Sequence, residues 1–144
     1  MDIDKYTING KIQLSSGLKT DQYYNFEKIT PEDKLKIAEL LKREFLIAKD
    51  IFEDLVIISI GKIGMAITQL IQDKIIVYHY NPELKTIIDG RVKAPYIIFT
   101  DVIKTFSTIL DCIKEVQKNY DYEPIKIICI KNALDIIDLS EEYE

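Results

Sequence analysis

The sequence predicts a single α/β domain built on a small parallel sheet with helices on both faces. Continuous apolar runs of strand length, such as Leu55–Ile60 and Tyr96–Thr100, alternate with amphipathic stretches of helical length. Strands that are apolar throughout need cover on both faces, which is typical of parallel sheets. At 144 residues the chain is long enough for one core and too short for two, so we expect one domain over residues 1–144.

The N-terminal third is expected to hold an extended segment followed by a long helix. Tyr6–Leu14 and Tyr23–Ile29 read as two short extended pieces on either side of a turn. Thr30 then supplies an N-cap, and the proline and acidic residues after it are favoured in the first turn of a helix. These features predict a helix over Pro31–Lys49. Apolar residues recur along it at helical spacing, at Leu35, Ile37, Ala38, Leu41, Phe45 and Ala48.

The rest of the chain is expected to alternate strands and helices. Strands are predicted at Leu55–Ile60, Ile75–Tyr80, Tyr96–Thr100 and Ile125–Ile130. Helices are predicted from the turn Gly61–Gly64 to about Gln72, over Thr105–Asn119, and from about Asn132 to Leu139. The strand Tyr96–Thr100 should lie between Leu55–Ile60 and another core strand. Ligands of such sheets bind beyond the carboxyl ends of the strands, here at Gly61–Gly64, Tyr80–Gly90 and Asp101–Thr108.

Charge and composition exclude several classes of function. The net charge of −5 gives no broad attraction to phosphate backbones, so nucleic acid is not an expected partner. The apolar runs are too short to span a bilayer and the N-terminus lacks the features of a signal peptide, so we expect a cytoplasmic protein without a membrane partner. Cys112 and Cys129 lack metal-ligand spacing, and no metal centre is expected. His79, the single histidine, is interpreted as a structural polar residue.

The strand, polar loop and helix of Tyr96–Gln117 are the strongest candidate for a ligand site. A helix N-terminus that follows a polar loop favours an anion such as a 5′-phosphate, although the same residues can simply cap the helix. Asp101 is either a ligand of a hydroxyl group or a helix cap. The candidate phosphate-binding residues are Lys104, Thr105, Phe106, Ser107 and Thr108.

Four segments of the chain carry a resemblance to a known family. They are GKIQLSSGLKTDQYYNFEKI, VIISIGKIGMAITQLI, RVKAPYIIFTDVIKTFSTILDCIKEVQ and YEPIKIICIKNALDIIDLSEE. Taken in this order, they resemble the orotate phosphoribosyltransferases, which are type I phosphoribosyltransferases. The resemblance implies a nucleotide or phosphoribosyl ligand, magnesium as the cofactor of the reaction, and a homodimer.

The resemblance also implies roles for individual residues. Asp101 would hold a ribose hydroxyl or a magnesium-bound water, and Lys85 is the only lysine in the segment that supplies catalytic cations in the family. The pyrophosphate loop corresponds to Gly61, Lys62, Ile63 and Gly64. The base-binding wall corresponds to Lys19, Tyr23 and Tyr24, of which the tyrosines also suit a subunit interface.

Several departures from the family pattern bear on catalysis. Thr100 stands where the first of two acidic residues is expected, and Phe106 replaces the glycine that lets backbone N–H groups approach a phosphate. The segment VYHYNPELKTIIDG carries few of the cations that would stabilise a departing pyrophosphate. The closing strand also follows the helix Thr105–Asn119 almost directly, which makes the sheet smaller.

We therefore expect an orotate phosphoribosyltransferase-like protein that binds a nucleotide or phosphoribosyl compound and whose transferase activity is lost or reduced. One alternative is an active enzyme that makes orotidine monophosphate from orotate and phosphoribosyl pyrophosphate. The other alternative is a structural or regulatory partner protein without a small-molecule ligand, which the Phe106 substitution would suit.

Overall fold

The computed structural model describes residues 7–13, 19–24, 26–73, 75–103 and 106–132, with side chains from residue 26 to residue 131. Its elements, in chain order, are β1 (Thr7–Gln13), β2 (Lys19–Tyr24), α1 (Pro31–Lys49), β3 (Val56–Ile60), α2 (Gly61–Thr68), β4 (Val77–Asn81), β5 (Thr86–Ile87), β6 (Tyr96–Ile103), α3 (Ser107–Gln117) and β7 (Lys126–Asn132).

The core of the molecule is a five-stranded sheet in the order β5-β4-β3-β6-β7. Strands β4, β3, β6 and β7 are parallel, and only the two-residue β5 pairs antiparallel, with β4. Strand β6 lies between β3 and β7, which confirms the neighbours predicted for Tyr96–Thr100. Strand β5 was not predicted, because two residues are too few to give a periodic pattern.

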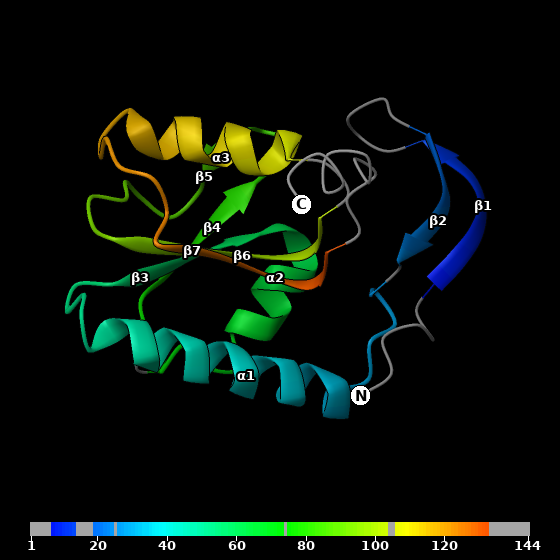
Figure 1. Ribbon diagram of the computed structural model, residues 1–144, viewed down its shortest axis with the longest axis horizontal. Helices are drawn as coiled ribbons and strands as arrows, with labels where there is room; N and C mark the ends of the chain where they lie inside the picture. The colour runs from blue at the N-terminus through cyan, green and yellow to red at the C-terminus, as the bar shows by residue number, and fades with distance from the viewer. Residues whose placement is uncertain (1–6, 14–18, 25, 74, 104–105, 133–144) are drawn as a thin grey trace, which may run out of the picture.

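Helices cover both faces of this sheet, as predicted. Figure 1 shows α1 and α2 on one side and α3 on the other. The strand residues alternate between two apolar clusters, so that Ile57, Ile97 and Phe99 pack with α1 and α2, whereas Ile58 and Ile98 pack with α3. Strand β3 lies between the two clusters, and all five of its residues are buried. The fold is therefore the predicted α/β sandwich.

Helix α1 begins and ends at the predicted residues. The Thr30 hydroxyl accepts the backbone N–H of Asp33 at 3.1 Å, which is the predicted N-cap. Leu35, one of the apolar residues at helical spacing, is 49% exposed and lies outside the core. Leu35 lies about 200° around the helix from the buried Ile37, so the two cannot share one face.

Several other boundaries differ from the sequence prediction. Helix α2 starts at Gly61 without an intervening loop and ends at Thr68, a turn before the predicted Gln72. Strand β6 continues past Thr100 to Ile103, and β7 continues to Asn132. The predicted final helix therefore starts inside a strand, and the rest of it lies outside the described residues.

The N-terminal segment forms an antiparallel hairpin of β1 and β2, which stands apart from the five-stranded sheet in Figure 1. Extended structure was predicted there, although β2 begins at Lys19 and ends at Tyr24, earlier than the predicted piece Tyr23–Ile29. Among the described residues, no helix has both the length and the apolar character that crossing a bilayer requires.

Candidate functional site

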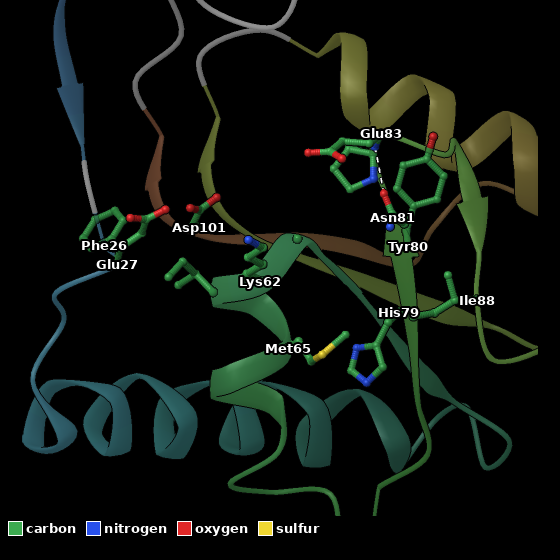
Figure 2. A pocket seen from close by; sticks show the side chains of 13 residues that line it. Phe26, Glu27, Lys62, Met65, His79, Tyr80, Asn81, Glu83, Ile88 and Asp101 are labelled. Atoms are coloured by element: carbon green, nitrogen blue, oxygen red, sulfur yellow. Dashed lines mark hydrogen bonds between the residues drawn. The ribbon is translucent and has the colours of Figure 1, made fainter.

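A pocket of about 390 Å³ opens at the carboxyl ends of β3, β4 and β6, where the sequence predicted a ligand site. Figure 2 shows Phe26, Glu27 and Asp101 on one side of it, Tyr80, Asn81 and Glu83 on the other, and Lys62 between them. The residues that line the pocket are Phe26, Glu27, Gly61, Lys62, Ile63, Met65, His79, Tyr80, Asn81, Pro82, Glu83, Ile88 and Asp101.

The floor of the pocket is the junction of β3 and α2. Gly61 has a φ of +81°, a left-handed conformation that lets the chain turn from strand into helix within one residue. Gly61, Lys62 and Ile63, which the resemblance assigns to a pyrophosphate loop, line the pocket and form the first turn of a helix. Gly64 faces the sheet instead, where a Cβ would lie 3.3 Å from the Cβ of Ser59.

Asp101 is the carboxylate that faces this floor. It lies within β6, and its Oδ1 accepts the backbone N–H of Val102 at 2.8 Å and the Thr100 hydroxyl at 3.4 Å. No hydrogen bond to its Oδ2 occurs within the described part of the chain. Burial raises the pKa of Asp101 above the usual value of an aspartate, although these hydrogen bonds partly oppose the rise. A half-buried acceptor is thus available to a ligand that carries a hydroxyl or N–H group.

The opposite wall of the pocket is a turn after β4. The Asn81 Oδ1 accepts the backbone N–H groups of Glu83 and Leu84 at 2.9 and 3.1 Å, which fixes the turn that holds Pro82 and Glu83 at the rim. This turn belongs to the segment Tyr80–Gly90, which the sequence predicted at the ligand-binding edge of the sheet. Phe26 and Glu27 were missed, since only the tertiary fold brings them to the strand ends.

A buried polar group lies at the lower end of the pocket. Ser59 and His79 are neighbours across β3 and β4, and the Ser59 hydroxyl is hydrogen-bonded to His79 Nδ1. The Asp89 carboxylate accepts the backbone N–H of His79 at 2.8 Å and lies 3.9 Å from its Nε2. Ser59 is fully buried and therefore closed to a substrate. These contacts fit the structural role predicted for His79, although its ring also lines the pocket.

The other predicted site residues are not among the described residues that line this pocket. Lys85 is exposed, has a φ of +54°, and forms an ion pair of 3.8 Å with Asp111 of α3, outside the pocket lining. Phe106 precedes α3 and is 37% exposed, and Ser107 and Thr108 form the first turn of that helix. Lys104 and Thr105 lie outside the described residues. The predicted base-binding residues belong to β2, and the side chains of Lys19, Tyr23 and Tyr24 also lie outside the described part of the structure.

The pocket carries more acidic than basic groups. Among the described residues that line it, Lys62 is the one lysine or arginine, whereas Glu27, Glu83 and Asp101 are acidic. Such a lining does not favour a highly charged anion by itself, because like charges within a few ångströms repel. Apolar side chains, including Ile63 and Met65, complete the lining and give a ligand apolar surface to contact.

Comparison with known proteins identifies the fold. None of the known family models matches the chain, and no curated protein matches its sequence. Solved structures do match. The orotate phosphoribosyltransferase from Mycobacterium tuberculosis in complex with inorganic phosphate has 16% identity and a TM-score of 0.64, over 96% of this chain and 86% of that one.

Two further structures agree with it. The orotate phosphoribosyltransferase from Aeropyrum pernix has 14% identity and a TM-score of 0.64, over 96% of this chain and 93% of that one. The UMP synthase from Leishmania donovani has 17% identity and a TM-score of 0.63 over 97% of this chain, which spans only 32% of that protein. The chain therefore has the type I phosphoribosyltransferase fold that the sequence resemblance implied.

Proposed function

We propose that this protein binds a nucleotide or a phosphoribosyl compound in the pocket at the ends of β3, β4 and β6, and that its transferase activity is lost or strongly reduced. The observation that carries the binding proposal is Asp101, which is partly buried at the pocket with one carboxylate oxygen free of hydrogen bonds within the described residues. A ribose hydroxyl supplies the donor that this oxygen lacks.

The rest of the ligand is assigned from the surrounding groups. The backbone at Gly61 and the Lys62 ammonium lie at the start of α2, where N–H groups and the helix dipole favour negative charge. The 5′-phosphate is assigned to the N-terminal turn of α3, at Ser107 and Thr108, together with the neighbouring Lys104 and Thr105. If magnesium accompanies the ligand, Asp101 is the carboxylate that would hold it through a water, since magnesium in proteins needs few direct ligands.

The distribution of cations supports the loss of activity. Phosphoribosyl transfer expels pyrophosphate, and positive groups at the leaving group stabilise that transition state. Among the described residues of the pocket lining Lys62 is the one cation, and Lys85 is paired with Asp111 of α3. With three carboxylates beside this ammonium, the described lining would stabilise the developing charge on pyrophosphate poorly.

Calorimetric titration tests the binding proposal. Orotidine monophosphate, uridine monophosphate, and phosphoribosyl pyrophosphate with magnesium would each be added to the protein, and we expect a one-to-one complex with at least one of them. Lys85→Ala is the control variant, because Lys85 lies outside the pocket lining. Absence of heat with every compound would favour the partner protein without a ligand.

A turnover assay tests the second half of the proposal independently. The protein would be incubated with orotate, phosphoribosyl pyrophosphate and magnesium, and orotidine monophosphate would be measured by its absorbance. We expect no formation above the rate without protein. Formation that disappears in Asp101→Asn would establish the active transferase instead.

A further inference from the structure

The turn after β4 presents two hydrogen-bonding groups that its own structure does not use. The Asn81 Oδ1 accepts the backbone N–H groups of Glu83 and Leu84, which fixes the orientation of the amide and leaves its Nδ2 as a donor. Within the described part of the chain, neither this Nδ2 nor the Glu83 carboxylate has a hydrogen-bond partner. The turn therefore offers one donor and one acceptor to a ligand.

Both groups belong to the wall of the pocket opposite Asp101. Asn81 and Glu83 line the pocket, and Figure 2 shows the Glu83 carboxylate extending from the turn toward the side that holds Asp101. The proposed function, on which this inference rests, assigns the ribose to Asp101 and the 5′-phosphate to the start of α3. The opposite wall is then left for the base, and Pro82 adds apolar surface there.

We propose that Asn81 and Glu83 determine which nucleotide binds. The preferred ligand is a nucleoside monophosphate whose base carries an exocyclic amino group beside an unprotonated ring nitrogen, as cytosine and adenine do. The Glu83 carboxylate accepts an N–H of the amino group, and the Asn81 Nδ2 donates to the ring nitrogen. Carboxylate and amide side chains recognise cytosine and adenine by contacts of this kind in nucleic acids. These contacts are separate from the base-binding residues that the resemblance assigns to β2.

The same two groups disfavour a base with a carbonyl oxygen in place of the amino group. In uracil and hypoxanthine the neighbouring ring nitrogen also carries a hydrogen. The carbonyl oxygen would then face the Glu83 carboxylate and the ring N–H would face the Asn81 donor, so that both contacts become repulsive. The acceptor at Glu83 and the donor at Asn81 thus select the same kind of base.

Calorimetric titration with two pairs of nucleotides tests this assignment. Cytidine and uridine monophosphate differ only at this edge of the base, as do adenosine and inosine monophosphate, so the ribose and the phosphate stay constant. In each pair that binds, we expect the amino-bearing nucleotide to have the lower dissociation constant, by about tenfold. Equal affinities within the pairs would overturn the assignment and leave the proposed function standing. Absence of heat with all four nucleotides would overturn both.

Glu83→Gln provides the second test, with Glu53→Gln as its matched control. Both substitutions replace an exposed glutamate by its neutral amide, but Glu53 lies outside the lining of this pocket. The amide of Glu83→Gln can rotate to donate to a carbonyl oxygen, so we expect its preference for the amino-bearing nucleotides to disappear. Glu53→Gln should keep the preference of the wild type. A preference that survives in Glu83→Gln would contradict the role of Glu83.

Asn81→Asp tests the donor without removing the acceptor that holds the turn. An aspartate still offers an oxygen to the backbone N–H groups of Glu83 and Leu84, but it has no N–H to donate to the base. We expect the ratio of the dissociation constants of uridine and cytidine monophosphate to fall at least ~5-fold. Because the ratio is taken within one protein, a loss of stability does not produce this change. An unchanged ratio would remove Asn81 from the contact with the base.

Discussion

The two turns that lead from strand to helix at the pocket are built differently. After β3, Gly61 adopts a φ of +81° and α2 begins at once, so the start of the helix lines the pocket. Strand β6 continues for two residues beyond Asp101. Phe106, which precedes α3, has a φ of −87°. Thus the turn after β3 brings backbone groups to the pocket, whereas the described residues at the end of β6 contribute the Asp101 carboxylate.

Because of this difference, the two turns would contribute differently to a bound ligand. A glycine with positive φ lets a helix start directly below a ligand, so the β3 turn retains the geometry of an anion site. At the β6 turn a bulky residue takes the position that the family resemblance assigns to glycine. We therefore predict that Asp101 contributes most to ligand affinity and that Phe106 lowers this affinity. Gly61 should contribute chiefly to the stability of the fold.

The largest effect is expected for Asp101→Asn. This substitution keeps an oxygen for the Val102 N–H but removes the negative charge that accepts the ribose hydroxyl. We expect the affinity for a nucleoside monophosphate to fall by about 1.5–3 kcal/mol, the usual contribution of a hydrogen bond to a charged group. Calorimetric titration measures it, and an unchanged affinity would remove Asp101 from the site.

The same variant should be more stable than the wild type at neutral pH. Because burial raises the pKa of Asp101 in the folded state, its ionisation opposes folding. The free energy of unfolding of the wild type should therefore fall, relative to Asp101→Asn, as the pH rises from the usual aspartate pKa through the raised one. Urea unfolding of both proteins across this range checks the sign.

Phe106→Gly is expected to raise ligand affinity, by less than Asp101→Asn lowers it. Glycine frees the turn before α3 to direct its N–H groups toward a phosphate. The gain in affinity for a 5′-phosphorylated ligand should reach about 1–2 kcal/mol after the cost of ordering a looser turn. Transferase activity should remain absent, because the pocket cations are unchanged. If Phe106→Leu tightens binding equally, backbone geometry is not the cause.

Gly61→Ala should affect stability rather than contacts. A Cβ at Gly61 meets nothing within 4 Å, so the cost comes only from the positive φ and should be about 1–2 kcal/mol of unfolding free energy. Gly61→Asn is the matched control, since asparagine tolerates this conformation better and should cost less. Equal losses in the two variants would show that φ is not the origin.

The smallest effect is expected for Lys85→Ala. Its ion pair with Asp111 is exposed and spans 3.8 Å, so its loss should change the free energy of unfolding by about 0–1 kcal/mol. Ligand affinity should stay within about twofold of the wild type because Lys85 does not line the pocket. Lys62→Ala, by contrast, should weaken binding about tenfold. A stronger effect from Lys85 would restore the catalytic role predicted for it.

The sequence predicted the fold well because its strands and helices are strongly patterned. The run Tyr96–Thr100 is apolar throughout, and only the middle of a covered sheet accommodates it. Thr30 and Pro31 fixed the start of α1 because capping is a local property. The exposure of Leu35 could not be predicted, because an apolar residue beside the buried face of a helix looks the same in sequence whether it is buried or exposed.

The site was predictable only in part. Asp101, Gly61 and Lys62 follow apolar runs, so the rule that ligands bind at strand ends was enough to find them. Asn81 lies in the segment Tyr80–Gly90, which the same rule indicated, whereas Phe26 reaches the pocket through a turn whose direction no local pattern specifies. The Ser59 to His79 contact depends on the register of two parallel strands, and the one available sign was a serine inside an apolar strand.

Nuclear magnetic resonance provides the most direct test of the central claim, that the pocket at the β3 and β6 turns binds a nucleotide. Orotidine monophosphate would be titrated into ¹⁵N-labelled protein, and His79 gives a single imidazole probe because the chain has one histidine. We predict that the amides of Lys62 and Val102 and the His79 ring shift together, whereas the amide of Lys118 does not. Shifts confined to the surroundings of Lys118, or none at all, would contradict the claim.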